Sequence, residues 1–127
     1  MTSLMKKLAL ATAVAAAPLM AATAASADGE KYILVSHAPD SDSWWNTIKN
    51  GIALAGEQMG VEVEYRNPPT GDLADMARII EQAAASGPNG IITTLADPDI
   101  LEGPIRSAVD SGVDVIIMNT GTPEKAR

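Results

Sequence analysis

The sequence predicts an α/β domain built on a doubly wound parallel sheet. Four apolar or β-branched runs alternate with stretches of helical spacing. The runs are "YILVS" (32–36), "VEVEY" (61–65), "GIITTL" (90–95) and "VDVIIMN" (113–119). They begin 23 to 29 residues apart. This spacing suits consecutive βαβ units, which place successive strands in one parallel sheet.

The four runs differ in how they are patterned. The third run and the core of the fourth are continuously apolar. Such runs are typical of strands that are covered on both faces. The second run alternates between apolar and charged residues and is therefore predicted to be an edge strand.

Each stretch between two runs has the apolar period of an amphipathic helix. The stripe of the first helix comprises Trp45, Ile48, Ile52, Ala55 and Met59. Similar stripes run through 73–84 and 105–109. A glycine follows each stretch, as helix C-caps prefer: Gly60, Gly87 and Gly112.

The first 27 residues are predicted to be a secretory signal peptide rather than part of the domain. A short basic start is followed by an almost wholly apolar stretch, 8–24, and then by the small-residue run Ala-Ser-Ala. This order is typical of a leader with an A-x-A cleavage site. A membrane-spanning helix is the competing interpretation, because about 17 apolar residues approach the length needed to span a bilayer. Pro18 interrupts the stretch and favours the leader.

Charge and composition narrow the function of the remaining domain, 28–127. Cleavage after Ala27 would leave 100 residues and, by removing Lys6 and Lys7, would take the formal charge from −7 to −9. So negative a surface repels nucleic acid and anionic lipid. The absence of cysteine excludes disulfides, thiolate metal sites and cysteine nucleophiles. We therefore expect a soluble, monomeric periplasmic product that does not insert into the membrane.

The loop after the first strand holds the first candidate binding residues. Ligands of open parallel sheets bind beyond the carboxyl ends of the strands. Asp42 or Ser43 could cap the helix that follows, or contact a ligand. Trp44 and Trp45 lie about 100° apart on that helix, so both rings are expected to lean toward the sheet. Because two adjacent indoles are hard to bury together, at least one is expected to stack on a sugar or a cation.

Two further loops at the same edge carry polar candidates. Asp97 precedes Pro98 and suits a helix cap, whereas Asp99 with Glu102 has the spacing of a competing capping box. Only one aspartate is needed as the cap, so the other is free to accept hydrogen bonds from ligand hydroxyls. Asn119 follows the fourth strand and offers both a donor and an acceptor.

Several chemistries have no support in the sequence. No G-x-G-x-x-G, Walker-type loop or G-x-S-x-G elbow is present. His37 is the only histidine, and a lone loop histidine is usually solvated, so neither a metal nor another cofactor is expected. Arg66 and Asn67 are expected in an exposed turn. Nothing indicates an enzyme.

The stretches "YILVSHAPDSDSWWNTIKNGIALAGEQMGVEVEY" and "GPNGIITTLADPDILEGPIRSAVDSGVDVIIMNTG" resemble the periplasmic sugar-binding proteins of ABC importers, of the ribose- and galactose-binding type. The resemblance covers residues 30 to 121. It implies three α/β/α layers, the strand order 2-1-3-4, and a membrane permease as transient partner. It also implies that a sugar stacks on Trp44 and Trp45 while Asp42, Asp97 and Asn119 bind its hydroxyls.

Members of that family have two lobes and are more than twice as long as this chain, which corresponds to an incomplete first lobe. We therefore expect half a sugar site and a marginally stable or aggregation-prone domain, 28–127. Three alternatives remain. A ligand sensor for a chemoreceptor or histidine kinase has the same fold. A free-standing flavodoxin-like domain would need a fifth strand and a phosphate loop. The effector domain of a repressor is disfavoured by the export signal.

Overall fold

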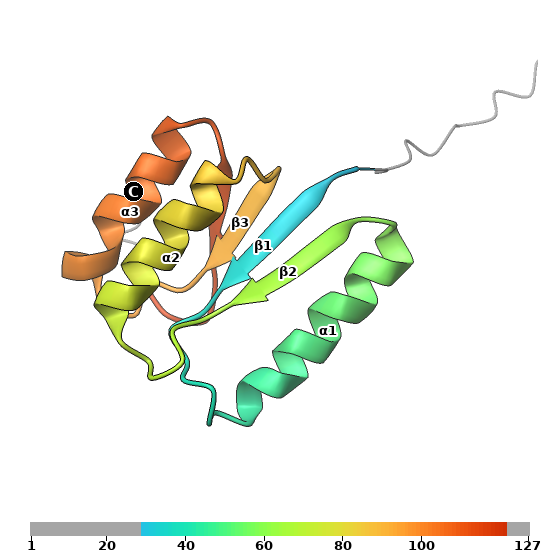
Figure 1. Cartoon of the computed structure of the whole chain (residues 1–127), viewed down its shortest axis with the longest axis horizontal. Helices are drawn as coiled ribbons and strands as arrows, with labels where there is room; N and C mark the ends of the chain where they lie inside the picture. The colour runs from blue at the N-terminus through green and yellow to red at the C-terminus, as the bar shows by residue number, and fades with distance from the viewer. Residues whose placement is uncertain (1–28, 122–127) are drawn as a thin grey trace, which may run out of the picture.

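A computed structural model describes residues 29–121, and the predicted leader lies outside the described residues. Within this range strands and helices alternate as predicted (Figure 1). In chain order they are β1 (Lys31–Val35), α1 (Trp44–Met59), β2 (Glu62–Arg66), α2 (Leu73–Ala85), β3 (Gly90–Thr93), α3 (Pro98–Asp110) and β4 (Asp114–Ile117).

The four strands form one parallel sheet in the order β2-β1-β3-β4, as predicted. Leu34 of β1 pairs with Tyr65 of β2 on one side and with Ile92 of β3 on the other. Ile92 in turn pairs with Ile116 of β4. The prediction that the second strand is an edge strand is confirmed. Because all strands run the same way, their carboxyl ends meet at one edge, which we call the carboxyl edge.

The face of β2 that carries Glu62, Glu64 and Arg66 is charged rather than apolar. The Lys31 Nζ lies 3.1 Å from a carboxylate oxygen of both Glu62 and Glu64, and Arg66 donates to Glu64 at 2.7 Å. The guanidinium of Arg66, followed by the ammonium of Lys31, lowers the pKa of Glu64 from 4.5 to about 2. Charged side chains on an edge strand oppose pairing with other chains.

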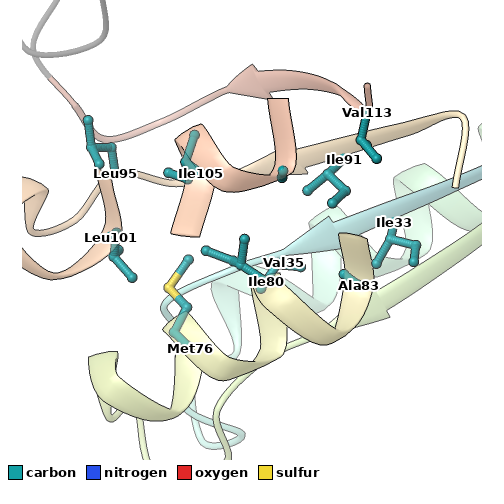
Figure 2. Close-up of a cluster of buried hydrophobic side chains, with 11 residues drawn as sticks. Ile33, Val35, Met76, Ile80, Ala83, Ile91, Leu95, Leu101, Ile105 and Val113 are labelled. Carbon is teal, nitrogen blue, oxygen red and sulfur yellow. The ribbon is translucent and has the colours of Figure 1, made fainter. Parts of the chain in front are cut away.

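One face of the sheet is covered by α2 and α3, which lie side by side (Figure 1). Figure 2 shows the core that they bury against the sheet. Its buried members are Ile33, Val35, Met76, Ile80, Ala83, Ile91, Leu95, Leu101, Ile105, Ala108 and Val113. The order 2-1-3-4 explains this layering, because right-handed crossovers that move in one direction place their helices on the same face.

The opposite face is covered by α1 alone. Leu34, Ala38 and Trp45 are buried there, with Ile48 and Ile52 packed against them. Close approach of the helix to β2 requires a glycine, since a Cβ at residue 56 would collide with the side chain at residue 63. The helix therefore covers the β2 and β1 half of the face.

The β3 and β4 half of this face is open, contrary to the prediction that the fourth strand is covered on both faces. Ile116 remains 64% exposed. A groove of about 370 Å³ runs between α1 and β4, and its walls include Ile52, Met59, Ile92 and Ile116. The physical reason is that one helix is too narrow to cover four strands.

Helix ends follow the sequence signals. A glycine with positive φ follows each helix, at the three predicted positions. The Asp72 carboxylate caps α2 by accepting from the backbone N–H of Asp75 at 2.8 Å. From residue 29 to residue 121, no helix has the length and apolar character that a bilayer span requires.

Candidate functional site at the carboxyl edge

The loops at the carboxyl edge are tied to one another across the sheet. The His37 Nδ1, just after β1, is 2.9 Å from the hydroxyl of Thr94, just after β3. The backbone N–H of Leu95 donates to the carbonyl of Thr120, beyond β4, at 3.0 Å. The segments after β1, β3 and β4 therefore form one continuous surface.

The loop between β1 and α1 is braced by the segment after β2. The Asn67 amide donates to the carbonyl of Ala38 at 3.0 Å and to the carboxylate of Asp40 at 2.9 Å. The backbone N–H of Asp40 donates to the carbonyl of Pro69 at 3.0 Å. The expectation that Arg66 and Asn67 belong to an exposed turn is therefore wrong. Arg66 ends β2, and Asn67 is partly buried because its amide satisfies the facing loop.

The two tryptophans lie at the start of α1 but have different environments. Trp45 is 3% exposed and belongs to the core beneath α1, whereas Trp44 is 51% exposed. Their ring centroids are 5.2 Å apart and the ring planes are nearly perpendicular, at 85°. The prediction that both rings lean toward the sheet is right for Trp45 and wrong for Trp44. The 100° step around the helix carries Trp44 off the buried stripe, so the buried indole supports an exposed one.

Trp45 is enclosed by His37, just after β1, and by Tyr65 of β2. His37 contacts it edge-to-face at 5.7 Å between ring centroids, and Tyr65 is tilted against it at 6.3 Å. The Tyr65 hydroxyl is hydrogen-bonded to the hydroxyl of Ser36 at 2.5 Å, and the Lys49 ammonium lies 4.6 Å from the centre of the Tyr65 ring. Burial raises the pKa of Tyr65 above its ordinary value.

The sequence analysis did not propose Tyr65 or His37 as binding residues. Their position is the signal that could have found them, because one ends the "VEVEY" run and the other directly follows "YILVS". Side chains at the carboxyl ends of parallel strands are the ones that reach a ligand.

Asp42 caps α1, which is one of the two roles that the sequence predicts for it. Its carboxylate accepts from the backbone N–H of Trp44 at 3.0 Å. Ser43 occupies the N-cap position but makes no side-chain capping hydrogen bond. One oxygen of Asp42 is thus engaged, and the other makes no hydrogen bond to any described residue.

Asp97 caps α3. Its carboxylate accepts from the backbone N–H of Asp99 at 2.9 Å, and Pro98 occupies the first helical position. The competing start at Asp99 is therefore not used, and Asp99 lies exposed in the first turn. As with Asp42, one oxygen of Asp97 satisfies the helix while the second is left without a partner among the described residues.

Asn119 lies just beyond β4 and is exposed. Its backbone is left-handed, with φ 67°, a conformation that asparagine tolerates better than most residues. The predicted strand run extends to residue 119, but β4 ends at residue 117 because of this turn. The next residue, Thr120, has a buried hydroxyl without a hydrogen-bond partner among the described residues.

All five predicted site residues therefore lie on loops or helix ends at the carboxyl edge. Trp44 contacts Trp45 directly and is hydrogen-bonded to Asp42. Asp97 and Asn119 make no described contact with the tryptophans. They are joined to the same surface through the bond between Leu95 and Thr120. The apolar groove beside α1 includes none of the five.

Comparison with known proteins identifies the family to which this arrangement belongs. Residues 32–127 match a family described as periplasmic binding protein domain. The chain belongs to the periplasmic binding protein family. The strand order is that of a lobe of that family, and the sequence resemblance is confirmed.

Solved structures similar to this binding-protein chain come from several bacteria. One is a carbohydrate transporter from Acidothermus cellulolyticus in complex with myo-inositol, with 28% identity and a TM-score of 0.70. A sugar-binding protein of a sugar ABC transporter from Bacillus halodurans has 29% identity and a TM-score of 0.68. A periplasmic sugar-binding protein from Legionella pneumophila has 28% identity and a TM-score of 0.71.

The matches cover most of this chain but only part of each relative. They include 76%, 75% and 76% of the present chain, in the same order, and 34%, 32% and 36% of the solved chains. The periplasmic binding protein chain described here therefore spans about a third of the length of these relatives.

Proposed function

We propose that this chain is the sugar-binding first-lobe portion of a substrate-binding component of a carbohydrate ABC importer. In this role it binds a sugar in the periplasm, after export directed by residues 1–27, and delivers it to the membrane permease. It is a carrier and not an enzyme. The observation that carries the proposal is the half-exposed indole of Trp44, held perpendicular to the buried Trp45 at the carboxyl edge.

A sugar suits this edge because it has two kinds of surface. The face of an indole packs against the C–H face of a sugar ring, and Trp44 offers such a face to solvent. Ionised carboxylates accept hydrogen bonds from hydroxyls. Asp42 and Asp97 each keep one oxygen beyond the one used as a helix cap. Asn119 would supply a donor and an acceptor from the end of β4.

The tryptophan surface forms one wall of a site. Ligand sites with high affinity enclose most of the ligand and exclude water from its polar contacts. Relatives of which this chain matches only about a third have further chain with which to build a second wall. We therefore propose that the present residues stack on one side of the sugar and that a second lobe would cover the other side.

The test uses the protein extended to a two-lobed length. Isothermal titration with glucose, galactose, arabinose and myo-inositol measures binding, and tryptophan emission reports stacking. We expect at least one of these ligands to bind and to change the emission. The Trp44→Ala variant should lose most of the affinity, while Trp45 remains as an internal reporter of folding. Absence of binding across the panel, or undiminished binding by Trp44→Ala, would contradict the proposal.

A further inference from the structure

His37 is held in a fixed orientation by two neighbours. Its Nδ1 is hydrogen-bonded to the Thr94 hydroxyl at 2.9 Å, and its ring meets the Trp45 indole edge-to-face at an interplanar angle of 86°. Thr94 is fully buried and Trp45 nearly so. Because Thr94 and Trp45 fix its imidazole, His37 is not the freely solvated loop histidine that the sequence predicts.

The second ring nitrogen of His37 has no protein partner. Among residues 29–121 no group forms a hydrogen bond with Nε2, and the side chain is only partly buried. Nε2 lies across the ring from Nδ1, so it is directed away from Thr94. The ring thus offers one unpaired polar atom at the carboxyl edge, beside the wall formed by Trp44 and Trp45.

We infer that His37 is a ligand contact whose Nε2 forms a hydrogen bond with an oxygen of the bound sugar. This inference rests on the proposed function of the same site. Thr94 makes no other side-chain hydrogen bond in the described part of the chain, so its hydroxyl is able to donate to Nδ1. In that tautomer the proton is on Nε2, which donates to the ligand.

The nearby candidate residues Asp42 and Asp97 lack a hydrogen-bond donor, which His37 supplies. Asp42 and Asp97 accept hydrogen bonds when ionised and cannot bind an oxygen that itself only accepts. A cyclic sugar has such an atom in its ring oxygen, and each hydroxyl oxygen also accepts. His37 therefore supplies a fixed donor that the two carboxylates lack, and the ligand class it selects is a polyhydroxylated ring with an acceptor oxygen facing β1.

The competing explanation is that His37 only anchors Thr94, and two variants separate the roles. In His37→Asn the side-chain amide reaches the position of Nδ1, so the bond to Thr94 is kept and the group at Nε2 is lost. In His37→Gln the amide reaches the position of Nε2, so a donor to the ligand is kept. A purely structural role predicts that the asparagine variant behaves like the wild type.

The experiment uses the full chain, recovered from the periplasm of an expression host and labelled with ¹⁵N. D-galactose, L-arabinose and myo-inositol are added at millimolar concentrations. His37 is the only histidine, so its Nδ1 and Nε2 signals are unambiguous. We expect a saturable shift of Nε2 together with the indole signals. Affinity should fall about fivefold to tenfold in His37→Asn, the value of one net hydrogen bond, and by less than about threefold in His37→Gln.

Each outcome decides a different point. Saturable indole shifts with an unmoved Nε2, or wild-type affinity in His37→Asn, would overturn the inference and leave the proposed function standing. If no sugar moves the indole signals of the wild type, the proposed function fails and the His37 contact fails with it. Backbone amide spectra of both variants show whether the fold is retained.

Discussion

The unequal burial of the two tryptophans predicts unequal costs of removing them. A large aromatic side chain buries about 200 Å² when fully enclosed, and apolar burial contributes about 25 cal/mol per Å². Trp45 is 3% exposed, so Trp45→Ala should lower the free energy of unfolding by about 5 kcal/mol. Trp44 is 51% exposed, so Trp44→Ala should lower it by about 2.5 kcal/mol at most.

Each variant retains a single tryptophan, which makes the assay self-checking, because the sequence contains only two. Urea unfolding followed by far-UV circular dichroism gives the two free energies. Emission of Trp44→Ala comes from the buried ring and should be blue-shifted and resistant to acrylamide. Emission of Trp45→Ala comes from the exposed ring and should be red-shifted and readily quenched.

A loss of about 5 kcal/mol is comparable with the whole stability of a small domain. Trp45→Phe keeps most of the buried area and serves as the second variant if Trp45→Ala does not fold. Equal costs at the two positions would refute the division of the pair into a buried support and an exposed stacking surface. So would efficient quenching of the ring that remains in Trp44→Ala.

Three further predictions concern charge, capping and the open face of the sheet. The lowered pKa of Glu64 means that its stabilising contribution is complete above pH 4.5 and is lost as the pH falls toward about 2. Glu64→Gln should therefore flatten the decline of the urea midpoint in that pH window. An unchanged decline would count against the ion pairs. Asp97→Ala should cost about 1 kcal/mol in urea unfolding and Asp97→Asn much less, whereas equal costs would argue against the cap. Ile116→Lys should change the free energy of unfolding by no more than about 0.5 kcal/mol and reduce self-association in sedimentation velocity. Ile33→Ala, the control in the buried core, should cost about 2 to 5 kcal/mol. A large loss of stability at Ile116 would mean that the groove is closed.

The strand pattern was predictable because the residue pattern of each strand reflects which of its faces is buried. Alternation of valine and glutamate in "VEVEY" predicts that one face of that strand is apolar and the other is polar. In the structure β2 lies at an edge, with its glutamates paired to Lys31 and Arg66. The glycines that end the helices were predictable as well, because a positive φ favours glycine whatever the distant residues are. Such signals need no knowledge of distant residues.

The site was only partly predictable because its decisive contacts join residues far apart in the chain. His37 and Thr94 are 57 residues apart, and Asn67 reaches Ala38 over 29 residues. Neither pairing leaves a local pattern, so His37 was expected to be solvated and Asn67 to be in an exposed turn. For Trp44 and Trp45 the periodicity was correct, but a helical wheel alone could not show how far around α1 the cover extends.

The same limit explains the error at β4. An apolar run such as the fourth strand indicates that its faces need cover, but it does not say which element provides it. The crossovers of β2-β1-β3-β4 place α2 and α3 on one face, and a further right-handed crossover beyond β4 would add its helix to that same face. Any cover for Ile116 on the α1 side would therefore come from a segment that crosses back over the sheet or from another chain. The carboxyl edge depends less on such cover, since Trp45 is packed by residues of β1, β2, β3 and α1 together with Ala38 and Met118. The groove shares Ile52 and Ile92 with this cluster, but Ile116 is not part of it. Ile116→Lys should therefore leave the environment of Trp44 unchanged.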